Sequence, residues 1–417
     1  MALFTSPSNR NVTPIHQDRN LQIIIGITLM AILGIISLNP AMPTLAQAFD
    51  VPMDQIGLVI AVFVVPITIG TPIFGMLADR VGRKKILVPS LLLFALGGVL
   101  CASAQDFHAL LEWRFLQGIG AASLESLALT LIGDLYIGKM LIPAMAFNAS
   151  MIGIGSTLFP LLGGALAGLS WRLVFLLSLS AVPLALLVIT KLKLPKQQVK
   201  TENFALKDYL KSTWSSIRNR HVLGLLFAVM CVFMMQFGPC FVYIPMFAGS
   251  SLQAKSEIIG ILMASMQVSL AFFASQLGFF AKRFSEAQLI KTSFALFAIA
   301  LSITPFVHTI WLLFIPSILI GAAEALALPP TRAMLARLSP NDARAGFMSV
   351  NAMAQSVGQA LGPIFAGVAF SFWGMQGVFF ACAGFAVIAM IVVHALMTPY
   401  CHLKPSLSHS TELYVRR

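Results

Sequence analysis

Three ionisable residues lie inside long apolar stretches, where a charge is costly: Arg114, Glu125 and Glu324. Only 10% of the 417 residues are charged, whereas 58% are hydrophobic. An ionisable side chain within a membrane usually marks the path of a substrate, an ion or a proton. Removal of a carboxylate from water favours its protonated form. We therefore predict that Glu125 or Glu324 carries a proton, and that Arg114 tunes the local field or binds a substrate anion.

The spacing of these residues limits how they can interact. Arg114, Gly118, Ala121 and Glu125 are spaced to share one helical face. Glu125 lies about 16 Å beyond Arg114 along a continuous helix, so the two cannot pair directly. Either carboxylate could instead be satisfied by polar groups of neighbouring helices, which is a packing role without proton transfer.

Four polar residues are weaker candidates for a substrate cavity. The stretch around residues 35–43 contains Asn39 but no titratable group, so proton coupling there is not supported. The other three candidates are Gln236, Asn351 and Gln355. Polar side chains between helices often make only packing hydrogen bonds.

The elements that position these residues are predicted to be membrane helices, because one span needs about 20 apolar residues. We predict an all-α membrane protein with helices near 21–48, 56–78, 84–104, 108–133, 142–168, 172–193, 221–248, 256–281, 288–307, 310–332, 343–371 and 375–398. The predicted domains are an N-terminal six-helix bundle at 1–193, a cytoplasmic linker at 194–220 and a C-terminal six-helix bundle at 221–417, including a short tail.

Lysine and arginine are placed asymmetrically along this topology. With the amino terminus inside, all of the 27 Lys and Arg residues except Arg114, Arg172 and Lys255 fall on the inner side. Such a bias predicts that both termini and the linker are cytoplasmic. The net charge of +12 is then a topology signal, with some attraction for anionic lipid, and not the mark of a nucleic-acid partner.

The two halves show an internal repeat. Gly75 and Gly278 are separated by 203 residues, and each begins a similar segment with alanine three residues later and arginine five residues later. The same shift relates the Gly155–Pro160 segment to the Gly358–Pro363 segment. One offset for two separate pairs predicts two parallel six-helix repeats, with a substrate site between them near the middle of the membrane.

The most specific motif connects the second and third predicted helices. It contains Gly75, Asp79, Arg80, Gly82 and Arg83 in the form GxLADRxGRK. Gly75 would permit close helix contact, and Gly82 would allow a tight turn. Asp79 can accept hydrogen bonds from a neighbouring helix start or from Arg83.

This motif resembles the signature of the major facilitator superfamily, and the resemblance covers nearly the whole chain. It implies a cluster of Asp79, Arg83 and Asp134 that acts as a latch for the outward-open state. A plain basic anchor would explain the arginines but not Asp79 or the glycines.

A second motif resembles the one that marks the antiporter branch of this superfamily. It comprises Gly155, Pro160, Gly163 and Gly164, although Phe159 stands where the family has glycine. Gly358, Gly362 and Pro363 restore the full form in the second half. Close packing and a helix bend explain the same residues without any direction of transport.

The resemblance implies a proton-coupled exporter of amphipathic drugs or metabolites that works by alternating access. The alternative is a dedicated exporter or importer of one solute, such as a siderophore, a lipid or a sugar. We expect a monomer in a bacterial inner membrane whose partners are a small-molecule substrate, protons and the lipid bilayer. No enzyme signature, metal spacing or cofactor motif is recognised, so we expect neither enzymatic activity nor a cofactor.

Overall fold

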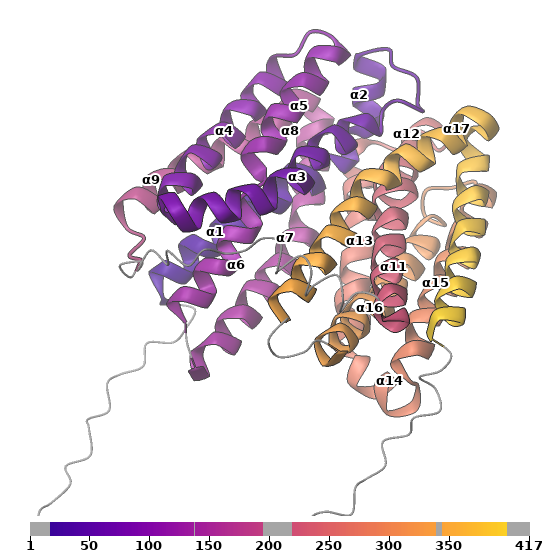
Figure 1. The fold of residues 1–417 in the computed structure, drawn as a ribbon. Coiled ribbons are helices and arrows are strands. Elements are labelled where there is room, and N and C mark those ends of the chain that lie inside the picture. The colour runs from indigo at the N-terminus through magenta and orange to yellow at the C-terminus, as the bar shows by residue number, and fades with distance from the viewer. Residues whose placement is uncertain (1–16, 137, 195–218, 339–343, 398–417) are drawn as a thin grey trace, which may run out of the picture. The chain divides into compact units, whose positions relative to one another are not determined.

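The computed structural model confirms the all-α prediction (Figure 1). It describes residues 17–136, 138–194, 219–338 and 344–397, without the side chains of 79, 139, 142, 336 and 344–349. Within these ranges no strand occurs. The α-helices are α1 (Arg19–Ile36), α2 (Met42–Ala48), α3 (Leu58–Val81), α4 (Arg83–Ser103), α5 (Phe107–Ala121), α6 (Leu124–Leu135), α7 (Leu141–Leu169), α8 (Trp171–Leu176), α9 (Ala181–Thr190), α11 (Arg220–Met235), α12 (Ile244–Ser250), α13 (Ser256–Ser275), α14 (Leu277–Arg283), α15 (Glu286–Ile303), α16 (Phe314–Leu338) and α17 (Arg344–Met397).

Eleven helical segments of the described chain are long and apolar enough to cross a bilayer. The last of them, Val350–Met397, has 48 residues, far more than the roughly 20 that one crossing needs. Gly374 interrupts it with a φ of 65°, a backbone conformation that favours glycine. The two final helices of the prediction are therefore present, on either side of Gly374.

Several helices that were predicted to be continuous are interrupted. The first contains a 3-10 segment, Asn39–Ala41, around Pro40, which cannot donate a backbone hydrogen bond. The fourth breaks at Ala122 and Ser123, between α5 and α6. The seventh contains a π-helical segment, Gln236–Tyr243, around Pro239. Segments of this kind free backbone groups inside a span and occur often at functional sites.

The described residues divide into two compact units. The first unit comprises residues 1–202 and 244–267, and the second comprises 203–243 and 268–417. In the first unit α13 packs closely on α7, since a Cβ at Gly164 would lie 2.5 Å from the carbonyl oxygen of Ser256. The predicted linker at 194–220 lies almost entirely outside the described residues, and the predicted domain boundaries stay a prediction.

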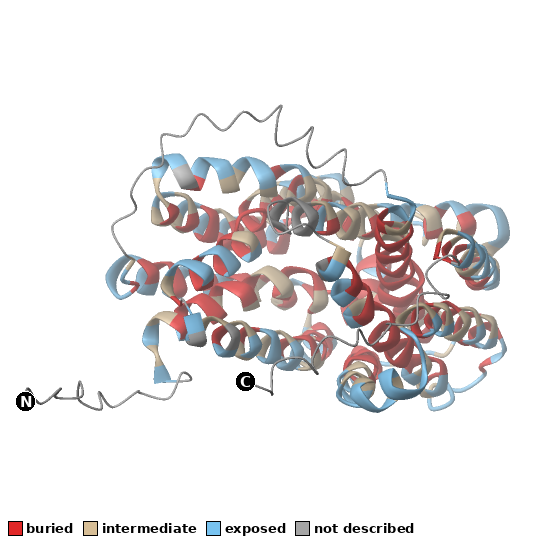
Figure 2. Cartoon of the chain, turned by 60° about the horizontal axis from the view of Figure 1, so that its bottom comes forward, coloured by how far each residue is buried: buried red, intermediate tan, exposed pale blue. Residues whose placement is uncertain are grey.

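Most helices have one buried face and one exposed face. Figure 2 shows buried positions in red between the helices of each unit and exposed positions in pale blue on their outer faces. Many of the exposed side chains are large and apolar, for example Ile69, Leu169 and Phe372. Such faces are unfavourable in water but suit contact with lipid. The burial pattern therefore agrees with helices that cross a membrane.

Candidate functional site

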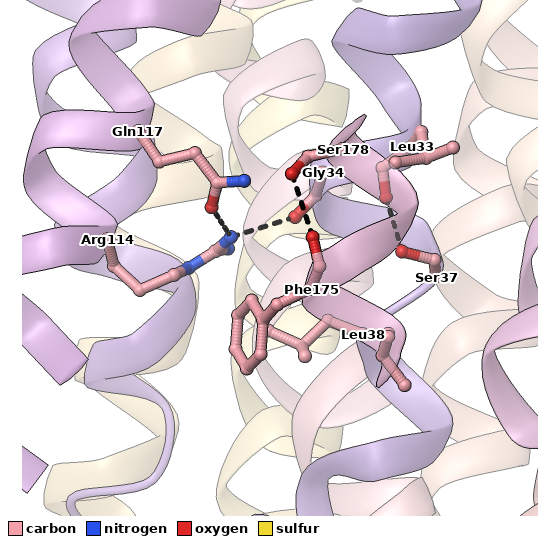
Figure 3. Close-up of a pocket in the computed structure, with 9 residues that line it drawn as sticks. Leu33, Gly34, Ser37, Leu38, Arg114, Gln117, Phe175 and Ser178 are labelled. Carbon is pink, nitrogen blue, oxygen red and sulfur yellow. Dashed lines mark hydrogen bonds between the residues drawn. The ribbon is translucent and has the colours of Figure 1, made fainter. Parts of the chain in front are cut away.

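Arg114 is the most deeply buried charged side chain among the described residues of the first unit. Figure 3 shows its side chain pointing toward Gly34 and Gln117. The break after α1 leaves the carbonyl oxygen of Gly34 without its usual helical donor, because the Leu38 amide bonds to Ile35 instead. Arg114 Nη1 donates to this oxygen at 3.1 Å and to Gln117 Oε1 at 2.8 Å. A cation is also favoured at the C-terminal end of a helix dipole. Arg114 thus supplies a hydrogen-bond donor to a carbonyl oxygen that lacks its helical donor at the C-terminal end of α1.

The guanidinium of Arg114 joins three helices. Its Nε donates to the carbonyl oxygen of Val59 in α3 at 3.1 Å, and its centre lies 4.1 Å from the ring centroid of Phe63. The adjoining cavity of about 10 Å³ has room for about one water molecule. Among the described residues, Nη2 has no hydrogen-bond partner. This arrangement has the character of a structural junction, with space for a water molecule but not for a transported solute.

We expect Arg114→Met to destabilise the protein strongly. Each buried acceptor that loses its donor costs about 1–3 kcal/mol, and Arg114 serves three acceptors. The measurement is the melting temperature of the detergent-solubilised chain. Arg172→Met is the matched control, because exposed Arg172 also bonds to a carbonyl oxygen, that of Ala102. A shift no larger than that of the control would contradict the junction role of Arg114.

Glu324 is the buried carboxylate of the second unit. Only 1% of the residue is exposed, and its Oε2 accepts a hydrogen bond of 2.9 Å from Gln236 Nε2. Its Oε1 is buried and has no partner among the described atoms. Among the described residues, no basic side chain forms an ion pair with Glu324. Gln236 begins the π-helical segment, so two of the predicted candidates meet where the helix geometry changes.

Glu125 occupies a different environment. It lies in the first turn of α6, after the break at Ala122 and Ser123, and its side chain is exposed. Arg114 is buried in α5, and Ala122 and Ser123 between the two helices keep right-handed helical backbone angles. The prediction of one shared face therefore stays a prediction, although Arg114 is buried and Glu125 is exposed.

The other polar candidates differ in burial. Asn39 is fully buried in the first unit, and both of its amide atoms lack partners among the described residues. Asn351 is 5% exposed, with an Oδ1 that is also unpartnered in the described chain, and Gln355 is half-buried. Buried polar groups of this kind usually bind water or a ligand.

Arg83 of the signature motif forms an ion pair with Asp134, which lies outside the motif. Arg83 is the first residue of α4, and Asp134 lies in the last turn of α6. Gly82 separates α3 from α4 with a φ of 108°, which favours glycine. The side chain of Asp79, the third predicted member of the latch, lies outside the described residues.

Two further residues of this motif lie at open positions. Arg80 is exposed near the end of α3. A Cβ added to Gly75 would meet no atom of the described chain within 4 Å. Within the described residues, the expected close helix contact at Gly75 is therefore not seen.

A second ion pair joins Glu286 and Arg337 in the second unit. Arg83 and Glu286 are 203 residues apart, and so are Asp134 and Arg337. The two pairs thus occupy equivalent positions of the repeat, with their charges exchanged. The second pair was not predicted from the sequence, although the offset of 203 residues applied to Arg83 and Asp134 leads to Glu286 and Arg337.

The predicted packing glycines lie at close helix contacts. A Cβ at Gly155 would lie 2.6 Å from Leu29 of α1, and one at Gly163 would overlap the backbone of Ser37. In the second unit, a Cβ at Gly362 would lie 2.6 Å from the carbonyl oxygen of Met234. Gly164, Gly358 and the carbonyl of Pro160 make similar contacts, and Pro363 is buried beside them. These residues support close packing in both halves and carry no information on transport direction.

Almost the whole chain is similar in sequence to one known protein family. The sequence model of the Major Facilitator Superfamily matches residues 24–255 and 241–410. The Bacillibactin exporter of Bacillus subtilis (strain 168) is 34% identical over 164 residues, which are 38% of this chain and 41% of that protein. Multidrug resistance protein 3 of the same organism is 33% identical over 139 residues, which are 33% of this chain and 27% of that protein. The matched segments therefore span less than half of either relative.

The fold is also similar to solved structures. A bacterial homologue of the human lysosomal transporter Spinster, in an inward-facing and occupied conformation, superposes with a TM-score of 0.79. The two chains are 18% identical, and the match covers 93% of this chain and 98% of that one. The nucleoside transporter NupG gives a TM-score of 0.75 at 16% identity. At such identities the likeness concerns the fold alone.

Proposed function

This chain belongs to the Major Facilitator Superfamily, and from that premise we propose that it is a secondary transporter that exports amphipathic small molecules in exchange for protons. Two curated relatives named as an exporter and as a multidrug resistance protein support the direction and the substrate class. The chain moves solutes and has no enzymatic activity. It acts as a monomer in a bacterial inner membrane, with both termini in the cytoplasm.

The observation that supports proton coupling is that Glu324 is buried and has no cationic partner among the described residues. A charged carboxylate in such surroundings is costly, so Glu324 is most easily accommodated with a proton bound. Oε1 lacks a partner among the described atoms and is the oxygen that takes the proton. The carboxyl group becomes charged when the path to water opens and the proton leaves.

The hydrogen bond from Gln236 links this proton to the helix geometry. A hydrogen bond to an ionised carboxylate is about twice as strong as one to a neutral acceptor. The π-helical segment that begins at Gln236 is therefore held more tightly when Glu324 is charged. Loss or gain of the proton thus changes the stability of a segment that interrupts a membrane helix, which provides a route from proton to conformational change.

A second candidate function is the export of one dedicated metabolite. The name of the Bacillibactin exporter, a relative matched over 38% of this chain, favours this alternative. Buried, unpartnered amide groups such as those of Asn39 would suit a substrate with fixed hydrogen-bonding groups.

The test is flux in proteoliposomes that contain the purified full chain. With an acidic interior and a more alkaline exterior, protons leave while ethidium, a lipophilic cation, accumulates inside, and a protonophore abolishes the accumulation. A panel of dyes and an iron-free siderophore distinguishes broad export from a dedicated route. Equilibration without uphill accumulation for every compound would contradict proton exchange.

A further inference from the structure

A groove of about 340 Å³ runs along the first and last helices of the N-terminal repeat, α1 and α9. Its lining combines basic and apolar side chains, and consists of Arg19, Gln22, Ile23, Leu184, Leu187 and Lys191. We propose that this groove binds one anionic phospholipid, with the headgroup phosphate at Arg19 and Lys191 and an acyl chain along the apolar wall. The site is separate from Glu324 and from the transport cycle proposed above.

The two helices run antiparallel past each other along the groove. Arg19 and Lys191 lie at one end, where the Lys193 amide donates a hydrogen bond of 3.0 Å to Asn20 Oδ1. At the other end the helices touch, because a Cβ at Gly26 would lie 2.9 Å from Leu184 Cδ1. From Arg19 to Gly26 the axial rise is about 10 Å. The groove is therefore open at its basic end and closed by helix contact at its apolar end.

The charges at the open end favour an anion. Arg19 and Lys191 are exposed, and Lys84 Nζ donates to the carbonyl oxygen of Ile189, which places a third cation at the same end of α9. The nearby carboxylate of Asp18 is engaged at the start of α1, where it accepts a hydrogen bond of 2.8 Å from the Asn20 amide. Guanidinium and ammonium groups together suit a phosphodiester.

The walls of the groove favour a lipid over a free phosphate ion. Ile23 and Leu184 are buried, and Leu187 is 44% exposed within the groove region. Neighbouring Leu186 and Ile189 are 58% and 54% exposed, so this side of α9 presents an apolar surface of the kind that faces lipid. A headgroup bound at the cations would place its chain against these residues. The positive-inside pattern puts the basic end in the cytoplasmic leaflet, where anionic lipids attract basic residues.

Native mass spectrometry of the full chain in detergent tests this site. We expect more bound phosphatidylglycerol than phosphatidylcholine of the same acyl chains. In the double variant Arg19→Gln/Lys191→Gln this preference falls roughly tenfold or more, since each basic group near an anionic lipid contributes about a fivefold effect. The matched control is Lys282→Gln/Arg283→Gln, which removes the same charge from exposed positions of α14 and keeps the preference.

Two further measurements distinguish binding of a lipid from binding of a soluble phosphate. Leu187→Gln leaves both cations in place, is tolerated at a partly exposed position, and reduces binding of phosphatidylglycerol. Glycerol phosphate at an equal concentration does not displace the lipid. The proposal is overturned if both lipids bind equally, if the control variant loses the preference as fully as the groove variant, or if glycerol phosphate displaces the lipid completely. Transport of ethidium is measured in parallel, and its presence or absence does not decide this test.

Discussion

Replacement of Glu324 by Gln is expected to abolish uphill transport driven by a pH gradient while substrate exchange continues. Glutamine keeps the shape of the side chain and can still bond to Gln236, but it cannot release a proton. Uphill accumulation in proteoliposomes should therefore fall to the level of vesicles without protein. Exchange of labelled for unlabelled substrate, which requires no net proton movement, should continue and become independent of pH.

Glu125→Gln is the matched comparison, because it makes the same chemical change at an exposed carboxylate. We expect this variant to keep most of its uphill transport. If it loses coupling while Glu324→Gln keeps it, Glu125 is the proton carrier and our assignment is reversed. If Glu324→Gln loses exchange as well as uphill transport, Glu324 binds substrate or stabilises the fold and does not only carry the proton.

Exchange of the charges between Arg83 and Asp134 is expected to stabilise the protein and to slow its transport cycle. Arg83 begins α4 and Asp134 ends α6, so each charge lies at the helix end whose dipole disfavours it. Glu286 begins α15 and Arg337 ends α16, so the equivalent pair has the favourable polarity. The double variant Arg83→Glu/Asp134→Arg should therefore gain about 1–2 kcal/mol.

The physical reason for the slower cycle is that a latch must open. A pair opposed by two helix dipoles breaks more easily than one supported by them, which suits an element that alternates between two states. Each single variant places like charges together and should be less stable than the wild type. Melting temperature and turnover in proteoliposomes are measured together for the single and double variants.

The control is the reverse exchange in the second unit, Glu286→Arg/Arg337→Glu, which should lose stability by a similar amount. A loss of stability in both double variants would show that local contacts outweigh the helix dipoles. Unchanged turnover in a stabilised Arg83→Glu/Asp134→Arg variant would contradict the latch role of the first pair.

The sequence by itself determined the membrane helices and the family. In a bilayer every backbone polar group must be satisfied within the span, so a run of about 20 apolar residues is sufficient to predict a helix. Gly82 was also informative, because its backbone conformation disfavours other residues. The offset of 203 residues relates Arg83 to Glu286 and Asp134 to Arg337. Only the structure showed that Glu286 and Arg337 also form an ion pair.

Only the tertiary structure distinguished Glu324 from Glu125 and assigned Arg114 to a junction. The spacing of Arg114 and Glu125 predicted similar surroundings for the two residues, but in the structure Arg114 is buried and Glu125 is exposed. Glu324 meets Gln236 from 88 residues away, and Arg114 meets Gly34 from 80 residues away. Hydropathy depends on neighbours in the chain, whereas burial and hydrogen bonding of a charged group depend on which helices pack together. For that reason the spans could be predicted from sequence, and the environment of each charge could not.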